Sequence, residues 1–201
     1  MRNLLLLLPF FISVINLAGA QNIIEHFDAS TPDYTLEELR KKFPNQIKKS
    51  GSELEHATLI ALHYYPKLRT NKIKIKHKKN VKHPITASYS FWNAFKIRRW
   101  HKYVLLIKKG SFVDGLDLNA KVGLIGHEMA HFEYYKNRPA ICMIPWGIRY
   151  VVSRKFRYSF ERDADKTTIE KGLGWQLMQI AFYTSREKIR ELMNENPIYA
   201  K

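Results

Sequence analysis

Two histidines, at positions 127 and 131, and a glutamate directly after the first of them form the pattern His-Glu-x-x-His. On a helix, residues four positions apart lie on the same face, so both imidazole rings can bind one Zn²⁺ ion. Glu128 then lies where a general base can activate a water molecule, which is the chemistry of a metallopeptidase. The pattern therefore predicts zinc ligands at His127 and His131 and a catalytic base at Glu128.

An acidic pair follows further along the chain, at Glu161 and Asp165. A catalytic zinc ion needs three protein ligands and one open position, and Glu161 can supply the third ligand. Asp165, one helical turn later, can accept a hydrogen bond from the free N–H of a ligand histidine. The alternative is a solvated acidic face. The upstream His-Glu-x-x-His pattern favours the ligand interpretation.

His-Glu-x-x-His followed by Glu-x-x-Ala-Asp resembles the gluzincin metallopeptidases, most closely the family of the CAAX prenyl endopeptidase and the heat-shock protease HtpX. The resemblance covers about residues 103–174. It implies His127, His131 and Glu161 as zinc ligands, Glu128 as the base and Asp165 as the residue that orients a ligand. The membrane proteases of that family have long transmembrane helices, for which this chain has no room. The resemblance thus implies a compact, exported zinc endopeptidase acting on a polypeptide, and the family's substrates are not carried over.

Two further points about the chemistry stay open at this stage. Tyr158 and His101 are candidates for a donor that stabilises the oxyanion of peptide hydrolysis. The alternative function is a catalytically inactive zinc- or peptide-binding module of the cell envelope.

The elements that must position these residues can be predicted from hydrophobic periodicity and capping residues. Asp117 is the expected N-cap of a helix over 118–136, and Gly172 ends a second helix over 159–171. Strict alternation and β-branched residues predict strands. The expected strands are 72–77, 85–91 and 103–108, and the other expected helices are 36–43, 53–65, 175–183 and 186–194.

The expected fold is α+β and zincin-like. A small mixed sheet packs on the helix that carries His127 and His131, a following helix carries Glu161, and the C-terminal part is mostly helical. The resemblance implies that the edge strand of the sheet pairs with an extended substrate. Segments 85–91 and 103–108 are both candidates for that edge.

The N-terminus predicts export. Residues 1–20 combine a basic start, an apolar run and Ala18-Gly19-Ala20, which is typical of a cleaved signal peptide. Residues 21–201 then form one domain, periplasmic or secreted. The alternative is an uncleaved membrane anchor at the N-terminus.

The 201 residues carry a formal net charge of +16, which favours contact with polyanions. We expect peripheral contact with an anionic membrane surface rather than nucleic acid, because the chain contains no recognised nucleic-acid motif. Segment 92–102, with two tryptophans and several basic residues, is either a solvated hairpin loop or a tip that faces membrane or substrate. The apolar run 139–152 is too short to span a membrane and is expected to be buried or interfacial. The single cysteine, Cys142, is expected to be buried within it.

Overall fold

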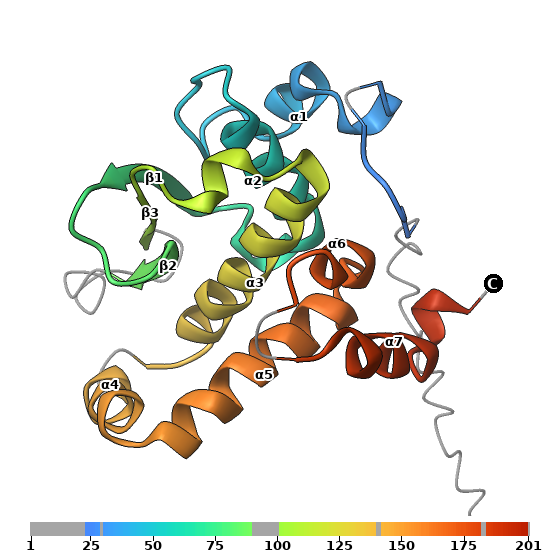
Figure 1. The fold of residues 1–201 in the computed structure, drawn as a ribbon. Coiled ribbons are helices and arrows are strands. Elements are labelled where there is room, and N and C mark those ends of the chain that lie inside the picture. Colours follow the sequence, from blue (N-terminus) through green and yellow to red (C-terminus); the bar gives the residue numbers. More distant parts are fainter. Residues whose placement is uncertain (1–22, 29, 90–100, 140–141, 182–183, 201) are drawn as a thin grey trace, which may run out of the picture.

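The central element of the fold is helix α3, Leu118–Lys136, which contacts helices α2, α5 and α6 and strand β2. The computed structural model describes residues 23–28, 30–89, 101–139, 142–181 and 184–200. Helix α3 begins at Leu118 because the Asp117 side chain accepts a hydrogen bond from the backbone N–H of Ala120 at 2.8 Å. The predicted bounds of this helix are confirmed, and it runs through the middle of the molecule (Figure 1).

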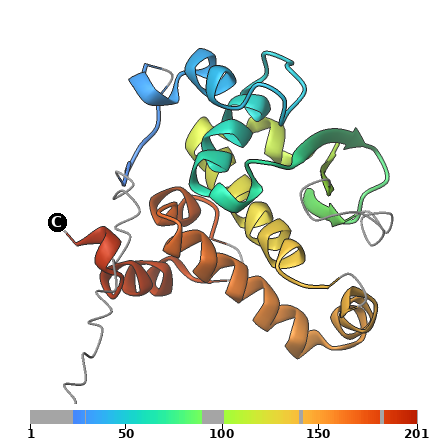
Figure 2. The ribbon, with the colours of Figure 1, turned by 180° about the vertical axis from the view of Figure 1, so that it is seen from behind.

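A three-stranded mixed sheet lies along one side of α3 (Figures 1 and 2). The strands are β1 (Lys72–Lys78), β2 (Ile85–Tyr89) and β3 (Lys102–Lys108), in the order β1-β3-β2. Strand β3 is central. It pairs in parallel with β1 and antiparallel with β2, and its alternate residues Tyr103, Leu105 and Ile107 are fully buried. Of the two segments considered for the substrate-side edge, 103–108 was therefore the wrong one, and β2 is the edge strand next to α3.

Of the other described helices, α2, α5 and α6 pack on α3, whereas α1, α4 and α7 pack mainly on those three helices. The region before the sheet forms α1 (Leu36–Lys42) and α2 (Glu53–Tyr64), and the region after α3 forms α4 (Met143–Val152), α5 (Arg154–Glu170), α6 (Gly174–Met178) and α7 (Arg186–Asn194). Short 3-10 turns complete the described elements, at Pro32–Tyr34, Pro66–Leu68, Phe112–Gly115 and Pro197–Tyr199. The expected α+β arrangement, with a mixed sheet on α3, a glutamate on a following helix and a helical C-terminal part, is confirmed.

Helices α1 and α2 end one residue before their predicted ends, and two other helices differ from their predicted extents by several residues. Helix α5 starts at Arg154 rather than Ser159, because the Ser153 side chain accepts a hydrogen bond from the backbone N–H of Phe156 and begins the helix earlier. Helix α6 is shorter than the predicted 175–183 segment and ends at Met178. The predicted signal segment 1–20 and most of segment 92–102 lie outside the described residues. No helix in the described part of the chain combines the length and apolar character needed to cross a bilayer.

The start of α2 is held by an ionic network around Glu55, whose side chain is 1% exposed. Its carboxylate accepts two hydrogen bonds from Arg40, at 2.7 and 2.9 Å, and further hydrogen bonds from the backbone N–H groups of Ser50 and Gly51. These partners hold the pKa of Glu55 at about 2, below its usual value, chiefly through the hydrogen bonds from Arg40. The network joins α1 and the loop before α2 to the buried part of the molecule.

Candidate metal centre

Three side chains from two helices converge on one point. His127 and His131 lie one turn apart on α3, and Glu161 lies on α5, which packs against α3. Their Nε2, Nε2 and Oε2 atoms are separated by 3.1 to 3.2 Å, and all three residues are buried. This His-His-Glu group could hold a metal ion, and among the described residues it is the one such cluster.

The donor set fits a zinc-sized cation. Metal–nitrogen and metal–oxygen distances of about 2.0–2.1 Å in a tetrahedron imply ligand atoms about 3.3 Å apart, close to the separations found here. Lone pairs on two imidazole nitrogens and a carboxylate repel one another unless a cation or shared protons lie between them. Two nitrogen ligands and one oxygen ligand also leave a fourth tetrahedral position free for a reactant.

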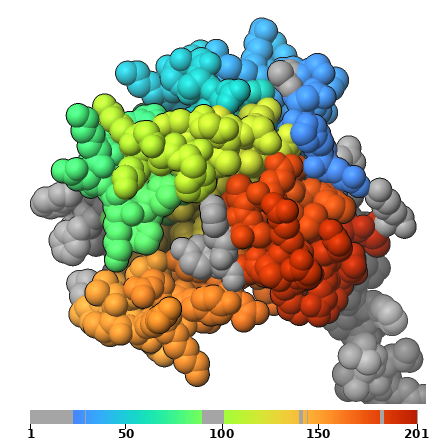
Figure 3. Space-filling view, viewed as in Figure 1, coloured from blue at the N-terminus to red at the C-terminus, as the bar shows by residue number. Residues whose placement is uncertain are grey.

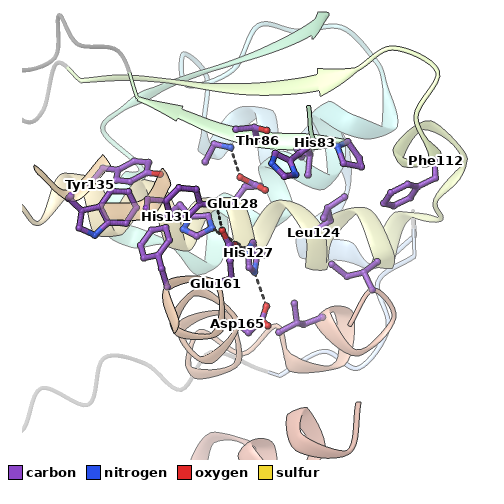
Figure 4. A pocket seen from close by; sticks show the side chains of 18 residues that line it. His83, Thr86, Phe112, Leu124, His127, Glu128, His131, Tyr135, Glu161 and Asp165 are labelled. Carbon is purple, nitrogen blue, oxygen red and sulfur yellow. Dashed lines mark hydrogen bonds and ion pairs between the residues drawn. The ribbon is translucent and has the colours of Figure 1, made fainter. Parts of the chain in front are cut away.

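The orientation of His127 is fixed by Asp165. His127 Nδ1 donates to Asp165 Oδ1 at 2.8 Å, so Nε2 points toward Glu161 (Figure 4). Asp165 is itself held by the Thr184 hydroxyl, which donates to its other carboxylate oxygen at 2.7 Å. The predicted contact of Asp165 with a ligand histidine is therefore present in the geometry.

The other two residues of the cluster are oriented by aromatic side chains. The Tyr150 hydroxyl donates to Glu161 Oε1 at 2.5 Å, which leaves Oε2 directed at the histidines. The His131 ring stacks on Phe160, with centroids 4.5 Å apart. Within the described residues the Nδ1 atom of His131 has no hydrogen-bond partner, so ring packing takes the place that Asp165 has behind His127.

The electrostatics of the cluster favour a positive charge at its centre. Burial on its own would lower the pKa of His127, but the hydrogen bonds to Asp165 and Glu161 outweigh burial and raise that pKa to about 10. Burial would raise the pKa of Glu161, whereas hydrogen bonds from His127 and His131 hold it far below its usual range. A metal ion that entered this site would release protons.

Glu128 lies beside the cluster, on the side that faces the sheet. Its carboxylate Oε2 accepts a hydrogen bond from the backbone N–H of Ala87 in β2 (Figure 4). Glu128 is buried like the three candidate ligands. The base predicted from the sequence therefore lies between the metal-ligand cluster and the edge strand.

The cluster opens into a pocket of about 490 Å³ between β2 and helices α3, α4, α5 and α6. Figure 4 shows His127, His131 and Glu128 in the middle of this pocket, with Tyr135 toward one end and Leu124 and Phe112 toward the other. The apolar lining on the side of Tyr135 also includes Trp146, Tyr150 and Phe160. The rest of the apolar lining includes Leu177 and Ile180. A peptide bond at the cluster would thus have apolar walls on both sides.

The two candidate oxyanion donors lie outside the lining of this pocket. Tyr158 is exposed on α5, with its ring 5.7 Å from the Arg162 guanidinium. His101 is buried just before β3, against the rings of Tyr89 and Tyr103. The oxyanion role of either residue stays a prediction.

Sequence reasoning missed three contributors to the site. They are Tyr150, which binds Glu161, Thr184, which binds Asp165, and the Ala87 N–H, which binds Glu128. Tyr150 lies in the apolar run 139–152, and its position one helix before Glu161 was the only available signal.

Comparison with known proteins adds no family to these observations. The chain matches no protein-family model, no curated protein and no solved structure.

Proposed function

We propose that this protein is a zinc-dependent endopeptidase of the gluzincin type, which hydrolyses peptide bonds of exported or envelope polypeptides. The observation that carries the proposal is the convergence of His127, His131 and Glu161 within 3.1–3.2 Å, with Glu128 beside them in one pocket. Two histidines and one carboxylate are a ligand set that zinc takes in catalytic sites. Export to the periplasm or medium, after removal of residues 1–20, is part of the same proposal.

Each residue has a separate role in the proposed reaction. When bound, zinc would polarise the scissile carbonyl and lower the pKa of a water molecule. Glu128 takes the proton as the water attacks and then delivers it to the leaving amine. Asp165 keeps the N–H of His127 on Nδ1, so that the lone pair of Nε2 faces the metal position.

The edge strand supports an extended polypeptide as the substrate. The Pro84 carbonyl accepts a hydrogen bond from the Lys108 N–H. In an antiparallel pair, the residues that bond to the neighbouring strand alternate with residues that do not. The backbone groups of Ile85 and Ala87 therefore point away from β3 and toward the pocket. A peptide laid along β2 would pair with such outward groups as an added strand. Glu128 lies next to this edge, where the scissile bond of a paired peptide would pass.

Zinc stoichiometry is the first test of the proposal. Elemental mass spectrometry of the purified protein should give about one zinc per chain. Glu161→Gln should lose most of that zinc, whereas Asp163→Asn, an exposed acidic position on the same helix, should keep it. Absence of zinc after reconstitution at neutral pH, or normal zinc in Glu161→Gln, would refute the assigned centre.

Hydrolysis is tested separately, with Glu128→Gln as the matched inactive variant. Envelope proteins and quenched-fluorescence peptides should be cleaved by the zinc-loaded protein and left intact by Glu128→Gln, which should still bind one zinc. If the variant cleaved as fast as the parent protein, Glu128 would not be the base. If neither protein cleaved any substrate while both held zinc, the inactive zinc- or peptide-binding module would be the better account.

A further inference from the structure

Helix α4 exposes an apolar face. Ile148, Val151 and Val152 are 60%, 73% and 75% exposed, and their spacing places them on one side of the helix. Within the described residues, six large hydrophobic side chains are exposed, and three of them belong to this short helix. A contiguous apolar face of this kind marks a surface that contacts something other than water.

The opposite face of α4 is firmly packed. Trp146 lies 4.3 Å from the Phe160 ring and stacks on Tyr150 at 5.5 Å, and Tyr150 binds the candidate ligand Glu161. The exposed apolar residues therefore do not reflect a helix that has failed to pack. In Figure 3, the orange region, which contains α4 and α5, forms the lower left edge of the molecule.

Exposed basic residues lie on α4 and at the start of α5, close in sequence to the apolar face. Arg149, Arg154 and Lys155 are exposed, and no aspartate or glutamate occurs between Glu133 and Glu161 in the sequence. Exposed apolar side chains next to exposed cationic ones are typical of helices that lie in the interface of an anionic bilayer. Nucleic acid would use the same cations but would leave the exposed isoleucine and valines in water.

From this face we infer that the protein docks on membranes containing anionic lipids, with α4 lying in the headgroup region. The 10 residues of α4 span about 15 Å, half the hydrocarbon thickness of a bilayer, so the helix lies in the interface and does not cross it. Because Trp146 and Tyr150 on its other face line the pocket, docking holds the pocket close to the membrane surface. Docking of this kind depends on the exposed side chains of α4 and on charge, and not on hydrolysis in the pocket.

The single cysteine allows a direct test at the helix itself. Cys142 is exposed and is the residue immediately before α4, so the expectation that it is buried was wrong. An environment-sensitive fluorophore on Cys142 should shift its emission to shorter wavelength when vesicles of phosphatidylcholine with about one-third phosphatidylglycerol are added. The fluorophore reports from the residue next to the start of α4, so a contribution of the N-terminal segment to membrane binding does not obscure the signal. Vesicles of phosphatidylcholine alone should give a much weaker response.

Variants of exposed residues separate the apolar and the ionic contributions. The triple variant Ile148→Ser, Val151→Ser, Val152→Ser should lower the affinity for anionic vesicles by about 100-fold. Each serine removes most of the favourable free energy of transferring the apolar side chain out of water. Arg154→Glu with Lys155→Glu should weaken this affinity about 20-fold or more. Ile198→Ser, an exposed apolar position outside α4, is the matched control and should behave as the parent protein.

Several results would overturn membrane docking. An emission that does not change on anionic vesicles is one, and a triple variant that responds like the parent protein is another. Analytical ultracentrifugation of the parent protein without vesicles measures whether two copies of the chain associate. A dimer that the triple variant abolishes, with no vesicle response, would assign the face of α4 to self-association instead. A shift produced by nucleic acid and not by vesicles would likewise reject the lipid surface.

Discussion

At Gly123, helix α3 lies in close backbone contact with α6, and this contact predicts how the protein responds to an added methyl group. A Cβ atom at this position would lie 2.4 Å from the Gln176 carbonyl oxygen and 2.8 Å from the Leu177 backbone nitrogen in α6. Ordinary contacts start near 3.4 Å, so Gly123→Ala requires α6 to retreat by about 1 Å. Because the clash is with backbone, no side-chain rotation relieves it.

Two opposing energies decide the result. Alanine is favoured over glycine inside a helix by about 1 kcal/mol. Forcing an extra carbon into packed backbone costs about 1–3 kcal/mol or more, and the retreat also strains the hydrogen bonds from Gln176 Nε2 to the carbonyls of Ile24 and Glu25. We expect Gly123→Ala to destabilise the protein by about 2 kcal/mol, which corresponds to a Tm lower by about 4–8 °C.

Thermal unfolding followed by circular dichroism measures this change. The matched control is Gly147→Ala in α4, where the added carbon meets no atom within 4 Å. Only the helix preference acts there, so its Tm should rise by a few degrees or stay unchanged. A Gly123→Ala protein as stable as the parent would show that α3 and α6 are not in close contact, and the walls of the pocket at Leu177 would then need revision.

Three further predictions concern the ligand environment and the response to acid. Asp165→Asn removes the negative charge next to His127, so the affinity for zinc should fall about 10- to 100-fold. Chelator competition measures this affinity, and an unchanged value would contradict the orienting role of Asp165. Tyr150→Phe removes the 2.5 Å hydrogen bond to Glu161 and should weaken zinc binding by about tenfold. The same assay measures this change, and zinc binding as tight as in the parent protein or tighter would contradict the role of Tyr150. The depressed pKa of Glu55, about 2, means that its ionised form stabilises the fold at pH values above its unfolded-state pKa near 4.5. About 3 kcal/mol should be lost as the pH falls from about 4.5 through 2, and Glu55→Gln, read by urea unfolding across this range, should remove that part of the pH dependence.

The sequence was most informative where structure depends on neighbours in the chain. The bounds of α3 follow from the Asp117 cap and the helical apolar spacing, both local properties. The pairing of His127 with His131 depends only on helical geometry. Glu161 could be proposed as a third ligand, and Asp165 as the residue that orients a histidine, because one helical turn separates them and places both on the same face of a helix. The structure brings both residues next to the histidine pair.

The contributors that were missed depend on tertiary contacts. Tyr150, Thr184 and Ala87 reach their partners across 11, 19 and 41 residues of sequence, and no spacing rule marks such pairs. The identity of the edge strand likewise depends on which strand pairs on both sides, and alternation of apolar residues does not report this. The early start of α5 shows the same limit on a smaller scale, since Ser153 and Ser159 are equally good caps by residue type.

A metal ion bound by the His-His-Glu cluster would also act as a cross-link that stabilises the folded chain. His131 and Glu161 are 30 residues apart, and a metal ion bound to both would close that stretch, including all of α4, into a loop. A cross-link of this length restricts the unfolded chain by about 3–4 kcal/mol in the entropy model used for disulfides. Neither α3 nor α5 contains a cysteine, so a metal ion bound at this cluster would be the covalent-like link between the two helices. Its strength would follow the free zinc concentration and the pH of the surroundings, and not their redox state.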